Sequence, residues 1–374
     1  MNVLSWIEVS KKALAANLRV LRSVVGQDVI LAPVVKANAY GHGILGVSEI
    51  LTKHGADWLC VASLEEAEAL RKSGLRKPIL IMGYVKRNLL ARAIQLRARM
   101  FVYDQKTAKL LSKIAKKLRS TALVHLKVDT GMSRQGINPD QAENFIAGAQ
   151  KLPNLKIEGI ATHFANSDES HHSFFQNQLL AFGALKNLLS SQKKKYVFHS
   201  ANSAATLLAT GSHFDLVRPG LALYGLYPSL AVRKICFKRG LILRPALSFK
   251  TRIIQTKVVP SGSYIGYGLA YRVRKLTKIA ILPVGYYDGL DRKLSNNGKV
   301  LIRGQRAPIV GRVCMDLTIV DITKIPSVTI EDEVVIIGKQ GDEEISAEDL
   351  AERANTINYE IVTRLRESLP RIYV

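Results

Sequence analysis

One lysine follows an apolar run in a way that suggests covalent chemistry. Lys36 comes directly after the apolar residues 32–35. An amine that emerges from such a run lies in partly dry surroundings, which favour its neutral form. A neutral amine is a nucleophile and can form a Schiff base with a carbonyl compound. Taken alone, the same lysine could extend its charged end to solvent or pair with a carboxylate.

Further polar side chains follow the later β-branched runs. They are Lys127, Asp129, His163, His199, Asn202, Ser203 and Arg218. A single histidine or lysine at a strand end is usually structural. If the runs are parallel strands of a barrel, however, their carboxyl ends share one rim, and the side chains converge there. The set therefore predicts an active site at that rim.

The elements that must position these residues alternate between short β-branched runs and longer segments of helical periodicity, from about residue 28 to residue 222. This alternation is typical of βα units and a parallel sheet. We predict eight strands, at 30–35, 58–62, 79–82, 99–102, 122–128, 157–163, 196–199 and 215–217. Eight units predict a (β/α)8, TIM-like barrel. The alternative is a doubly wound open sheet, which normally has a glycine-rich phosphate turn after its first strand, unlike residues 36–43.

Local signals support the helical segments between the predicted strands. Ser63 and Glu66 have the spacing of a capping box at a helix start. Leu14, Leu18 and Leu21 share one helical face before the first barrel strand.

After about residue 240 helical periods nearly vanish and short β-rich runs follow one another. We predict strands at 249–254, 279–284, 307–310, 317–321 and 334–337, and helices near 346–354 and 359–366. Turn residues separate these runs, as in a mainly β fold. The sequence thus predicts two domains, a barrel over residues 1–238 and a mainly β C-terminal domain over residues 239–374.

Composition is that of a globular protein, with 47% hydrophobic residues in 374. No apolar run approaches the roughly 18 residues of a membrane-spanning helix, and residues 1–6 lack the pattern of a signal peptide. The three cysteines, Cys60, Cys236 and Cys314, are far apart and have no metal-ligand spacing. We therefore expect a cytoplasmic protein that has no metal site and does not bind membranes.

The net charge of +24 comes from 54 Lys and Arg against 30 Asp and Glu. Such an excess raises the alternative of a nucleic-acid-binding protein. The basic residues are spread along the chain, and the densest run, 193–195, has no interleaved aromatic residues. A solvated basic surface, with no nucleic-acid partner, is the interpretation that we adopt.

Residues 36–43, Lys-Ala-Asn-Ala-Tyr-Gly-His-Gly, resemble the pyridoxal phosphate lysine segment of the alanine racemase family. The resemblance extends over essentially the whole chain, in the family's order, through residues 127–134, 162–165, 199–203, 217–220, 266–268, 285–289, 314–316 and 358–360. It implies a homodimeric, pyridoxal 5'-phosphate dependent amino-acid racemase, an isomerase. Such an enzyme interconverts L-alanine and D-alanine through a Schiff base with two-base proton transfer, and supplies D-alanine for peptidoglycan.

The resemblance also implies a role for each matching residue. Lys36 and the partner subunit's Tyr267 would be the two acid–base groups, so that each active site is shared between subunits. Arg134 and Met315 would contact the substrate, and Lys127 would be a candidate for carbamylation. The implied cofactor contacts are Lys36, Tyr40, His163, Asn202, Ser203, Arg218, Gly220, Leu221 and Tyr359.

Structural alternatives remain for several of these residues. Lys127 could pair with Asp129, Ser203 could cap a helix, and each tyrosine could be a core aromatic residue. Arg218 could form a structural salt bridge. Its implied role is sharper: an arginine only donates, so the pyridine nitrogen that it faces must stay unprotonated, which favours reprotonation at Cα over side reactions.

Other functions on the same plan are an amino-acid decarboxylase, a racemase for serine or basic amino acids, and a catalytically silent cofactor-binding protein. A decarboxylase would profit from a protonated pyridine and needs no second proton donor, so Arg218 and Tyr267 argue against it. Tyr267 and Met315 also argue against a silent binder, because only a shared active site requires them.

Overall fold

A computed structural model describes residues 3–169, 173–190 and 195–374. Residues 193 and 194 of the basic run, and the first two residues of the N-terminal segment, lie outside the described part. The chain divides into two compact units. One comprises residues 13–39 and 44–245, and the other comprises residues 1–12, 40–43 and 246–374. The domain limits 1–238 and 239–374 stay a prediction.

The first unit is built on an eight-stranded, entirely parallel sheet. In pairing order its strands are β2 (Ile30–Leu31), β9 (Leu216–Val217), β8 (Val197–His199), β7 (Leu155–Ala161), β6 (Ala122–Lys127), β5 (Arg99–Val102), β4 (Ile79–Ile81) and β3 (Leu59–Val61). A parallel bridge between Val34 and Cys60 joins the two outermost strands. Amide groups of Val35 and Cys60 donate across this seam at 2.8 Å each, to Cys60 and Pro33. The predicted (β/α)8 barrel is confirmed, although most of its strands are shorter than expected.

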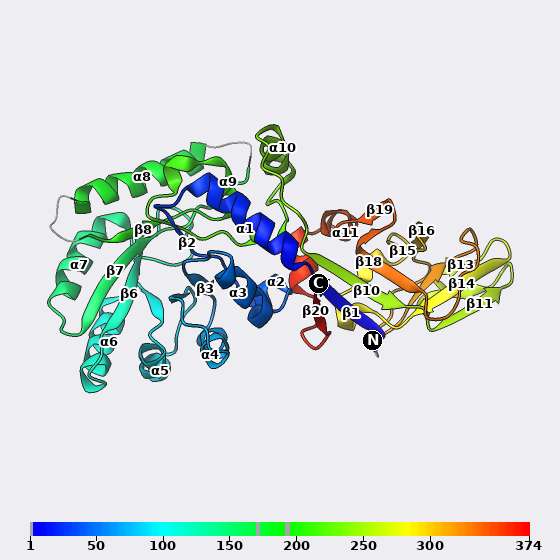
Figure 1. The fold of residues 1–374 in the computed structure, drawn as a ribbon, viewed down its shortest axis with the longest axis horizontal. Helices are drawn as coiled ribbons and strands as arrows, with labels where there is room; N and C mark the ends of the chain where they lie inside the picture. The colour runs from blue at the N-terminus through cyan, green and yellow to red at the C-terminus, as the bar shows by residue number, and fades with distance from the viewer. Residues whose placement is uncertain (1–2, 170–172, 191–194) are drawn as a thin grey trace. The chain divides into compact units, whose positions relative to one another are not determined.

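Helices follow the strands and lie outside them, as Figure 1 shows for α3 to α7. The helices are α1 (Lys11–Val25), α3 (Ile44–Lys53), α4 (Leu64–Lys72), α5 (Leu90–Gln95), α6 (Gln105–Lys117), α7 (Ala142–Gln150), α8 (Ser173–Ser190), α9 (Ser203–Leu208) and α10 (Leu230–Lys238). Short 3-10 turns are η1 (Arg87–Leu89), η2 (Pro139–Gln141), η3 (Thr210–Ser212) and η4 (Leu221–Tyr224). The capping box of Ser63 and Glu66 is present at the start of α4. Leu14, Leu18 and Leu21, which the sequence places on one helical face, lie in α1 and are buried.

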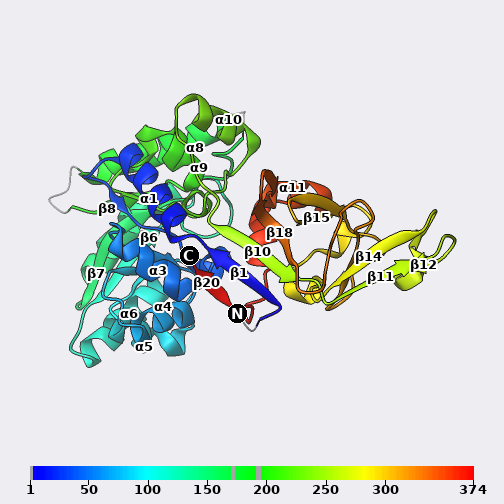
Figure 2. The same cartoon turned by 45° about the vertical axis from the view of Figure 1, so that its right-hand side comes forward.

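The second unit is mainly β, as predicted. Its largest sheet has the order β16 (Gln305–Pro308), β15 (Lys299–Ile302), β18 (Glu333–Gln340), β10 (Leu247–Arg252), β1 (Ser5–Val9) and β20 (Arg371–Tyr373), with β19 (Glu343–Ile345) beside β18. A second sheet contains β11 (Gln255–Val259), β14 (Thr277–Leu282) and β17 (Thr318–Asp321), and β12 (Tyr264–Ile265) pairs with β13 (Tyr271–Arg272). β11 and β14 lie side by side in Figure 2. Helices α11 (Ala347–Ala354) and α12 (Asn358–Thr363) and the turns η5 (Tyr267–Leu269), η6 (Tyr286–Asp288) and η7 (Arg292–Leu294) complete this unit.

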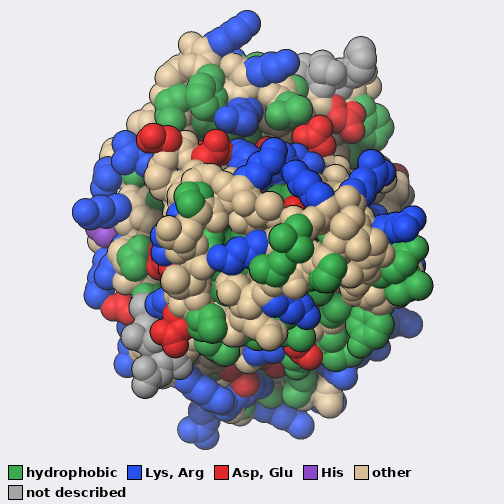
Figure 3. Space-filling view, turned by 90° about the vertical axis from the view of Figure 1, so that its right-hand side faces the viewer, with side chains coloured by type: hydrophobic (Ala, Val, Ile, Leu, Met, Phe, Trp, Pro, Cys, Tyr) green, Lys and Arg blue, Asp and Glu red, His purple; other side chains and the backbone are tan. Residues whose placement is uncertain are grey.

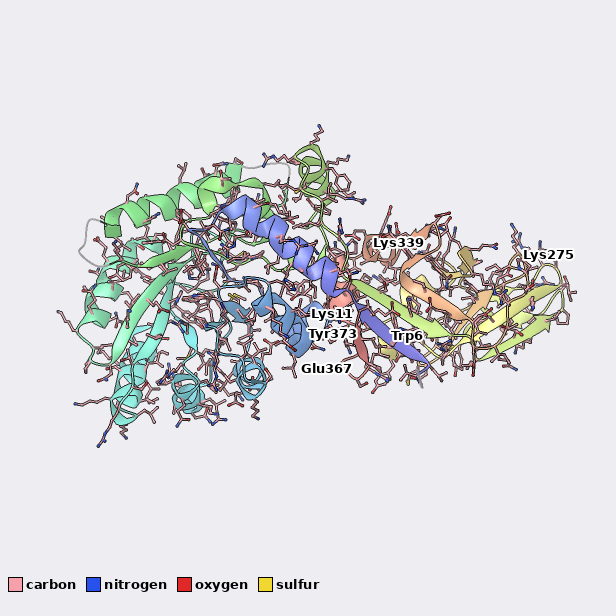
Figure 4. The ribbon with its side chains drawn as sticks, viewed as in Figure 1. Trp6, Lys11, Lys275, Lys339, Glu367 and Tyr373 are labelled. Carbon is pink, nitrogen blue, oxygen red and sulfur yellow. The ribbon has the colours of Figure 1, made fainter. Side chains whose placement is uncertain are left out.

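The N-terminal strand β1 was not predicted. It pairs antiparallel with β10 and parallel with β20, so residues from both ends of the chain meet in one sheet. Trp6 of β1, labelled in Figure 4, is buried, and the Arg252 guanidinium carbon lies 5.3 Å from its ring centroid. The strand is therefore held by packing as well as by its backbone pairing.

Surface features bear on the partners of the chain. Figure 3 shows Lys and Arg side chains scattered between hydrophobic and other side chains on the face that it views. Among the described residues, no helix has the length and apolar character needed to cross a bilayer. The same residues include no cluster of histidine, cysteine and carboxylate side chains that could hold a metal ion.

The backbone at Gly225 lies against the backbone at Arg244. The φ of Gly225 is +82°, and a Cβ atom there would lie 1.8 Å from the carbonyl oxygen of Arg244. Asn17 holds the two segments together, since its side chain donates to the carbonyls of Leu223 and Arg244 at 3.0 and 2.8 Å. No side chain fits at Gly225 without displacing backbone.

We predict that Gly225→Ala lowers the thermal unfolding midpoint far more than Gly26→Ala. Gly26 has a similar φ of +77° but nothing within 4 Å of the added Cβ. The control should therefore show only the left-handed penalty of roughly 1 kcal/mol, whereas Gly225→Ala adds about 3 kcal/mol of steric conflict. Equal midpoints for the two variants would show that the Arg244 backbone yields freely.

Candidate active site

Lys36 begins a left-handed turn at the carboxyl end of the first barrel strand. The segment Lys36–Tyr40, labelled α2, has φ values of +53°, +52° and +53° at Ala37, Asn38 and Ala39. Residues with a Cβ lose roughly 1–2 kcal/mol each in this conformation. Such a run of strained residues persists only where neighbours hold it, and it is typical of functional sites.

Three hydrogen bonds hold the turn. The Ala37 amide donates to Glu66 Oε1 at 2.6 Å, the Ile44 amide donates to Asn38 Oδ1 at 2.8 Å, and the Ala39 amide donates to the Val35 carbonyl at 2.9 Å. Glu66 is also the capping-box residue of α4 and accepts from the Ala62 amide at 2.7 Å. One carboxylate thus ties the lysine turn to the start of the next barrel helix.

The amine of Lys36 is easier to deprotonate than that of an ordinary lysine. Lys36 is exposed in the single chain, yet partial desolvation lowers its pKa, repulsion by Arg134 lowers it further, and Glu66 opposes both. The direction of this shift is that expected for an amine that acts as a nucleophile and a base.

Lys127 lies deeper, at the end of β6, with 5% of its surface exposed. Burial, aided by the charge of Arg218, lowers the pKa of its amine to about 7. The expected alternative, an ion pair with Asp129, is not among the ion pairs of the described residues. The Asp129 carboxylate instead accepts backbone N–H groups of Gly131, Ser133 and Arg134 at 2.9 to 3.1 Å, which shapes the loop that carries Arg134.

Arg218, after β9, is a buried cation without a carboxylate partner among the described ion pairs. Its Nη2 donates to the carbonyls of Thr162 and Ser200 at 2.8 and 3.2 Å, and its Nη1 makes a short hydrogen bond to His199 Nδ1. Burial lowers its pKa to about 10, so the guanidinium remains charged at neutral pH. The structural salt bridge considered above is replaced by carbonyl and imidazole acceptors.

Four of the predicted cations surround His163. Burial lowers the pKa of its imidazole well below the usual value, and Arg218, Lys127, Arg134 and Lys36 lower it further, in that order. All four cations therefore lie within electrostatic range of one imidazole, which stays neutral at pH 7. The strand-end residues converge on one region of the barrel.

The loops after β8 and β9 offer donors suited to a phosphate group. Asn202, and not Ser203, is the N-cap of α9, where it accepts from the Ala205 amide at 3.1 Å. Ser203 is buried, and its hydroxyl oxygen accepts from the amides of Gly220 and Ala222 at 2.9 and 3.2 Å. A hydroxyl and backbone amides thus meet at the start of η4, where Leu221 also lies.

The remaining predicted residues belong to the second unit. The rings of Tyr40 and Tyr359 lie 6.3 Å apart, with Tyr40 buried and Tyr359 half-buried. Tyr267 and Met315 are 72% and 54% exposed, a high value for side chains of this kind. Tyr267 projects from the tight turn η5, between the paired strands β12 and β13.

Sequence analysis missed two polar residues behind the rim, His125 and Glu158. His125 Nδ1 lies 2.7 Å from His199 Nε2, and His125 Nε2 lies 3.5 Å from Glu158 Oε2. A signal for His125 was available, because it stands two residues before Lys127 on a predicted strand and so shares its face. Glu158 had no such signal, since it lies at an irregularity in the strand pairing.

Comparison with known proteins agrees with this arrangement. The family model described as alanine racemase, N-terminal domain, matches residues 9–228, and the model described as alanine racemase, C-terminal domain, matches residues 246–373. An alanine racemase of Caldanaerobacter subterraneus subsp. tengcongensis is 42% identical over 98% of this chain and 94% of its own length. An alanine racemase of Methanococcus maripaludis is 40% identical over 99% of this chain and 98% of its own length.

Solved structures show the same likeness. The alanine racemase of Clostridium difficile 630 superposes with a TM-score of 0.94 at 35% identity, covering 100% of this chain and 96% of that chain. The alanine racemase of Bacillus anthracis with bound L-Ala-P superposes with a TM-score of 0.92 at 36% identity, with the same two coverages.

The left-handed turn yields a prediction at Ala37, whose side chain is exposed. Ala37→Val should lower the thermal unfolding midpoint, because a β-branched residue is strongly disfavoured at positive φ. Ala37→Gly should leave the midpoint unchanged or raise it, since glycine adopts this conformation without a Cβ penalty. If valine and glycine gave the same midpoint, the turn would not be strained.

Proposed function

Because the chain belongs to the alanine racemase family, whose members are pyridoxal phosphate dependent racemases, we propose that it interconverts L-alanine and D-alanine. A proton would leave one face of Cα and return on the other. The observation that carries the proposal is the pairing of β2 with β9. Lys36, an amine of lowered pKa, and Arg218, a buried guanidinium that only donates, follow these two neighbouring strands. The product would serve peptidoglycan synthesis in the cytoplasm.

The residues of the barrel fit pyridoxal 5'-phosphate. Lys36 Nζ would hold the cofactor's carbonyl carbon, and Asn202, Ser203, Gly220 and Leu221 would surround its phosphate, where the Ser203 hydroxyl already meets two amide groups. The bound cofactor withdraws electrons from Cα and so makes the Cα proton removable. Tyr40 and Tyr359 would add hydroxyl donors to the phosphate, and His163 would contact the cofactor as a neutral imidazole.

Arg218 would hold the pyridine nitrogen as an acceptor. A guanidinium with a pKa of about 10 donates at neutral pH and does not give up its proton. The cofactor would then withdraw electrons less strongly than a protonated pyridine does. Rapid return of a proton to Cα is the outcome that this arrangement favours, and a decarboxylase would gain nothing from it.

Two-sided proton transfer needs a second acid–base group opposite Lys36. We assign it to the partner subunit's Tyr267, in a homodimer with shared active sites, and place Met315 near the substrate carboxylate of the partner's site. The exposure of both side chains supports this role, because a group that serves another subunit must be accessible in the single chain.

Arg134 would bind the substrate carboxylate, and a carbamate on Lys127 would orient it. The neutral amine is the form that reacts with carbon dioxide, and a pKa of about 7 makes it abundant at neutral pH. The amine nitrogen bonds to the carbon of carbon dioxide and releases one proton, so the neutral amine becomes a carbamate anion. Arg218 and Arg134, which repel the ammonium, would attract the carbamate.

We predict that the chain, incubated with ¹³C-bicarbonate, shows a carbamate resonance that Lys127→Ala abolishes. The signal should weaken as the pH falls below about 7, because the protonated amine does not react. Lys116→Ala, on the exposed side of α6, is the control and should keep the resonance. A resonance that survives in Lys127→Ala would assign the carbamate elsewhere.

The decisive experiment combines the absorbance spectrum, with and without borohydride, and a D-amino-acid oxidase assay on L-alanine. Lys36→Ala should lose both the cofactor absorbance and turnover. Tyr267→Ala should keep the absorbance and lose about 10²- to 10⁴-fold in racemisation, while one enantiomer still exchanges its Cα proton with D₂O. Tyr264→Ala, an exposed tyrosine of the same hairpin, is the matched control.

Shared sites can be tested with the same variants. Mixing Lys36→Ala and Tyr267→Ala chains should restore roughly a quarter of wild-type activity, since half of the dimers are mixed and each has one intact site. Racemisation by Lys36→Ala alone would refute the mechanism. Absorbance without D-alanine formation in the wild type would move the function to another amino acid, a decarboxylase or a silent binder.

A further inference from the structure

A chain of polar side chains runs behind Arg218 through the interior of the barrel. It passes from Arg218 to His199 on β8, then to His125 on β6, and then to Glu158 on β7. Glu158 also pairs with Arg99 of β5, whose Nε and Nη2 donate to Oε2 and Oε1 at 2.7 and 3.2 Å. The chain therefore links the buried cation of the active site to a carboxylate outside it.

The donors in this chain point in one direction. Arg218 can only donate, so His199 Nδ1 must accept and His199 Nε2 must carry the proton. His125 Nδ1 accepts that proton, which leaves the proton of His125 on Nε2, facing Glu158. Burial is the main cause that lowers the pKa of both histidines, so each is a neutral imidazole with one donor and one acceptor.

The Glu158 carboxylate supports this direction from the end of the chain opposite Arg218. A carboxylate accepts and does not donate, and its hydrogen bonds with His125 and Arg99 overcome desolvation to hold its pKa at about 2. If a donor stood in its place, His125 would carry its proton on Nδ1 and His199 on Nδ1. His199 would then present an N–H group to the Arg218 guanidinium, and the two donors would oppose each other.

The backbone is shaped to bring Glu158 and His125 together. Val124 pairs with Ile157 and His125 pairs with Gly159, so Glu158 is the extra residue of a bulge in β7. Bulges re-aim side chains and recur beside active sites. Gly159 completes the fit, because a Cβ atom there would lie 2.5 Å from His125 Nδ1.

Stability alone gives little reason for this arrangement. The interior of such a barrel is usually filled by branched apolar side chains, whereas both histidines here are fully buried. Buried polar groups lose free energy unless they are fully paired, and apolar residues of similar volume are often equally stable or more stable. The one-way order of donors, which begins at Arg218 and ends on the Glu158 carboxylate, is what an apolar core could not provide.

We propose that Glu158 and His125 are positioning residues for the reaction, which keep His199 Nδ1 an acceptor and thereby hold the Arg218 guanidinium in place. The inference rests on the proposed function for the role of Arg218 toward the pyridine nitrogen. The inference adds Glu158 and His125, which would contact neither substrate nor cofactor. The position of the proton on His199 would then depend on the Glu158 carboxylate, which acts through His125.

The first test is ¹⁵N NMR of the histidine side chains in the full-length, cofactor-loaded protein. Wild-type His125 and His199 should both be neutral with the proton on Nε2. Glu158→Leu removes charge and acceptor and should shift the His199 ring signals, whereas Glu158→Gln keeps an acceptor oxygen and should shift them less. Glu68→Leu, which removes the carboxylate paired with Arg92 on the barrel exterior, is the matched control. A wild-type proton on Nδ1, or unchanged His199 signals in Glu158→Leu, would overturn the proposal.

The second test separates positioning from a structural role. Glu158→Leu and His125→Leu should alter the cofactor absorbance band and lower kcat about tenfold, with KM for alanine within about twofold, as expected for groups behind a functional side chain. His125→Asn, whose oxygen takes the place of Nδ1, should recover part of the loss. A lowered unfolding midpoint with unchanged absorbance and kcat would reject positioning. If the wild type shows the predicted proton positions on both histidines but does not racemise alanine, the proposed function is rejected. The assignment of the proton chain is then retained.

Discussion

The structure depends on keeping a guanidinium charged and oriented inside a β/α barrel. A buried cation is unfavourable unless acceptors surround it, and Arg218 finds them in two carbonyls and one imidazole nitrogen. The carbonyls belong to residues 162 and 200, at the ends of neighbouring strands β7 and β8, so the parallel barrel itself supplies them. The imidazole is different, because it accepts only while its proton lies on the far nitrogen. The barrel core therefore contains a line of polar groups behind Arg218, which runs through His199 and His125 to Glu158.

A second constraint acts at the end of β2, the strand that pairs with β9. The lysine must leave a buried strand and turn at once, and the left-handed conformation at residues 37–39 achieves this within one turn. Glu66 stabilises that turn, caps α4 and raises the pKa of Lys36 against the effects of burial and Arg134. One carboxylate, that of Glu66, thus influences both the position of the Lys36 amine and its pKa. A substitution at Glu66 would disturb both together, which distinguishes it from residues that only pack.

Much of this was readable from the sequence because it depends on local patterns. Alternating β-branched and helical segments predict eight barrel strands, and Lys36, Lys127 and Arg218 were found as polar residues directly after such strands. The strand β1 was missed because five residues before a helix carry no signal until β10 and β20, distant in sequence, give them partners. Glu158 was missed for a related reason: a bulge shifts the register by one residue, and the alternation of strand faces no longer tells where its side chain points. The roles of individual residues came from family resemblance and stay predictions.

The charge of the site connects these observations. Lys36, Lys127, Arg134 and Arg218 all act on His163, and the pKa of Lys127 is lowered by two of the arginines. Like charges held together raise the free energy of the folded chain until an anion joins them. The proposed function brings three anionic groups to the site. They are the phosphate of the cofactor, the carboxylate of the substrate and a carbamate on Lys127. Ligands that bind only the folded state stabilise it by mass action. Binding of these anions relieves the repulsion between the cations, which lowers the free energy of the complex. The cluster of positive charges thus favours the binding of these anionic groups.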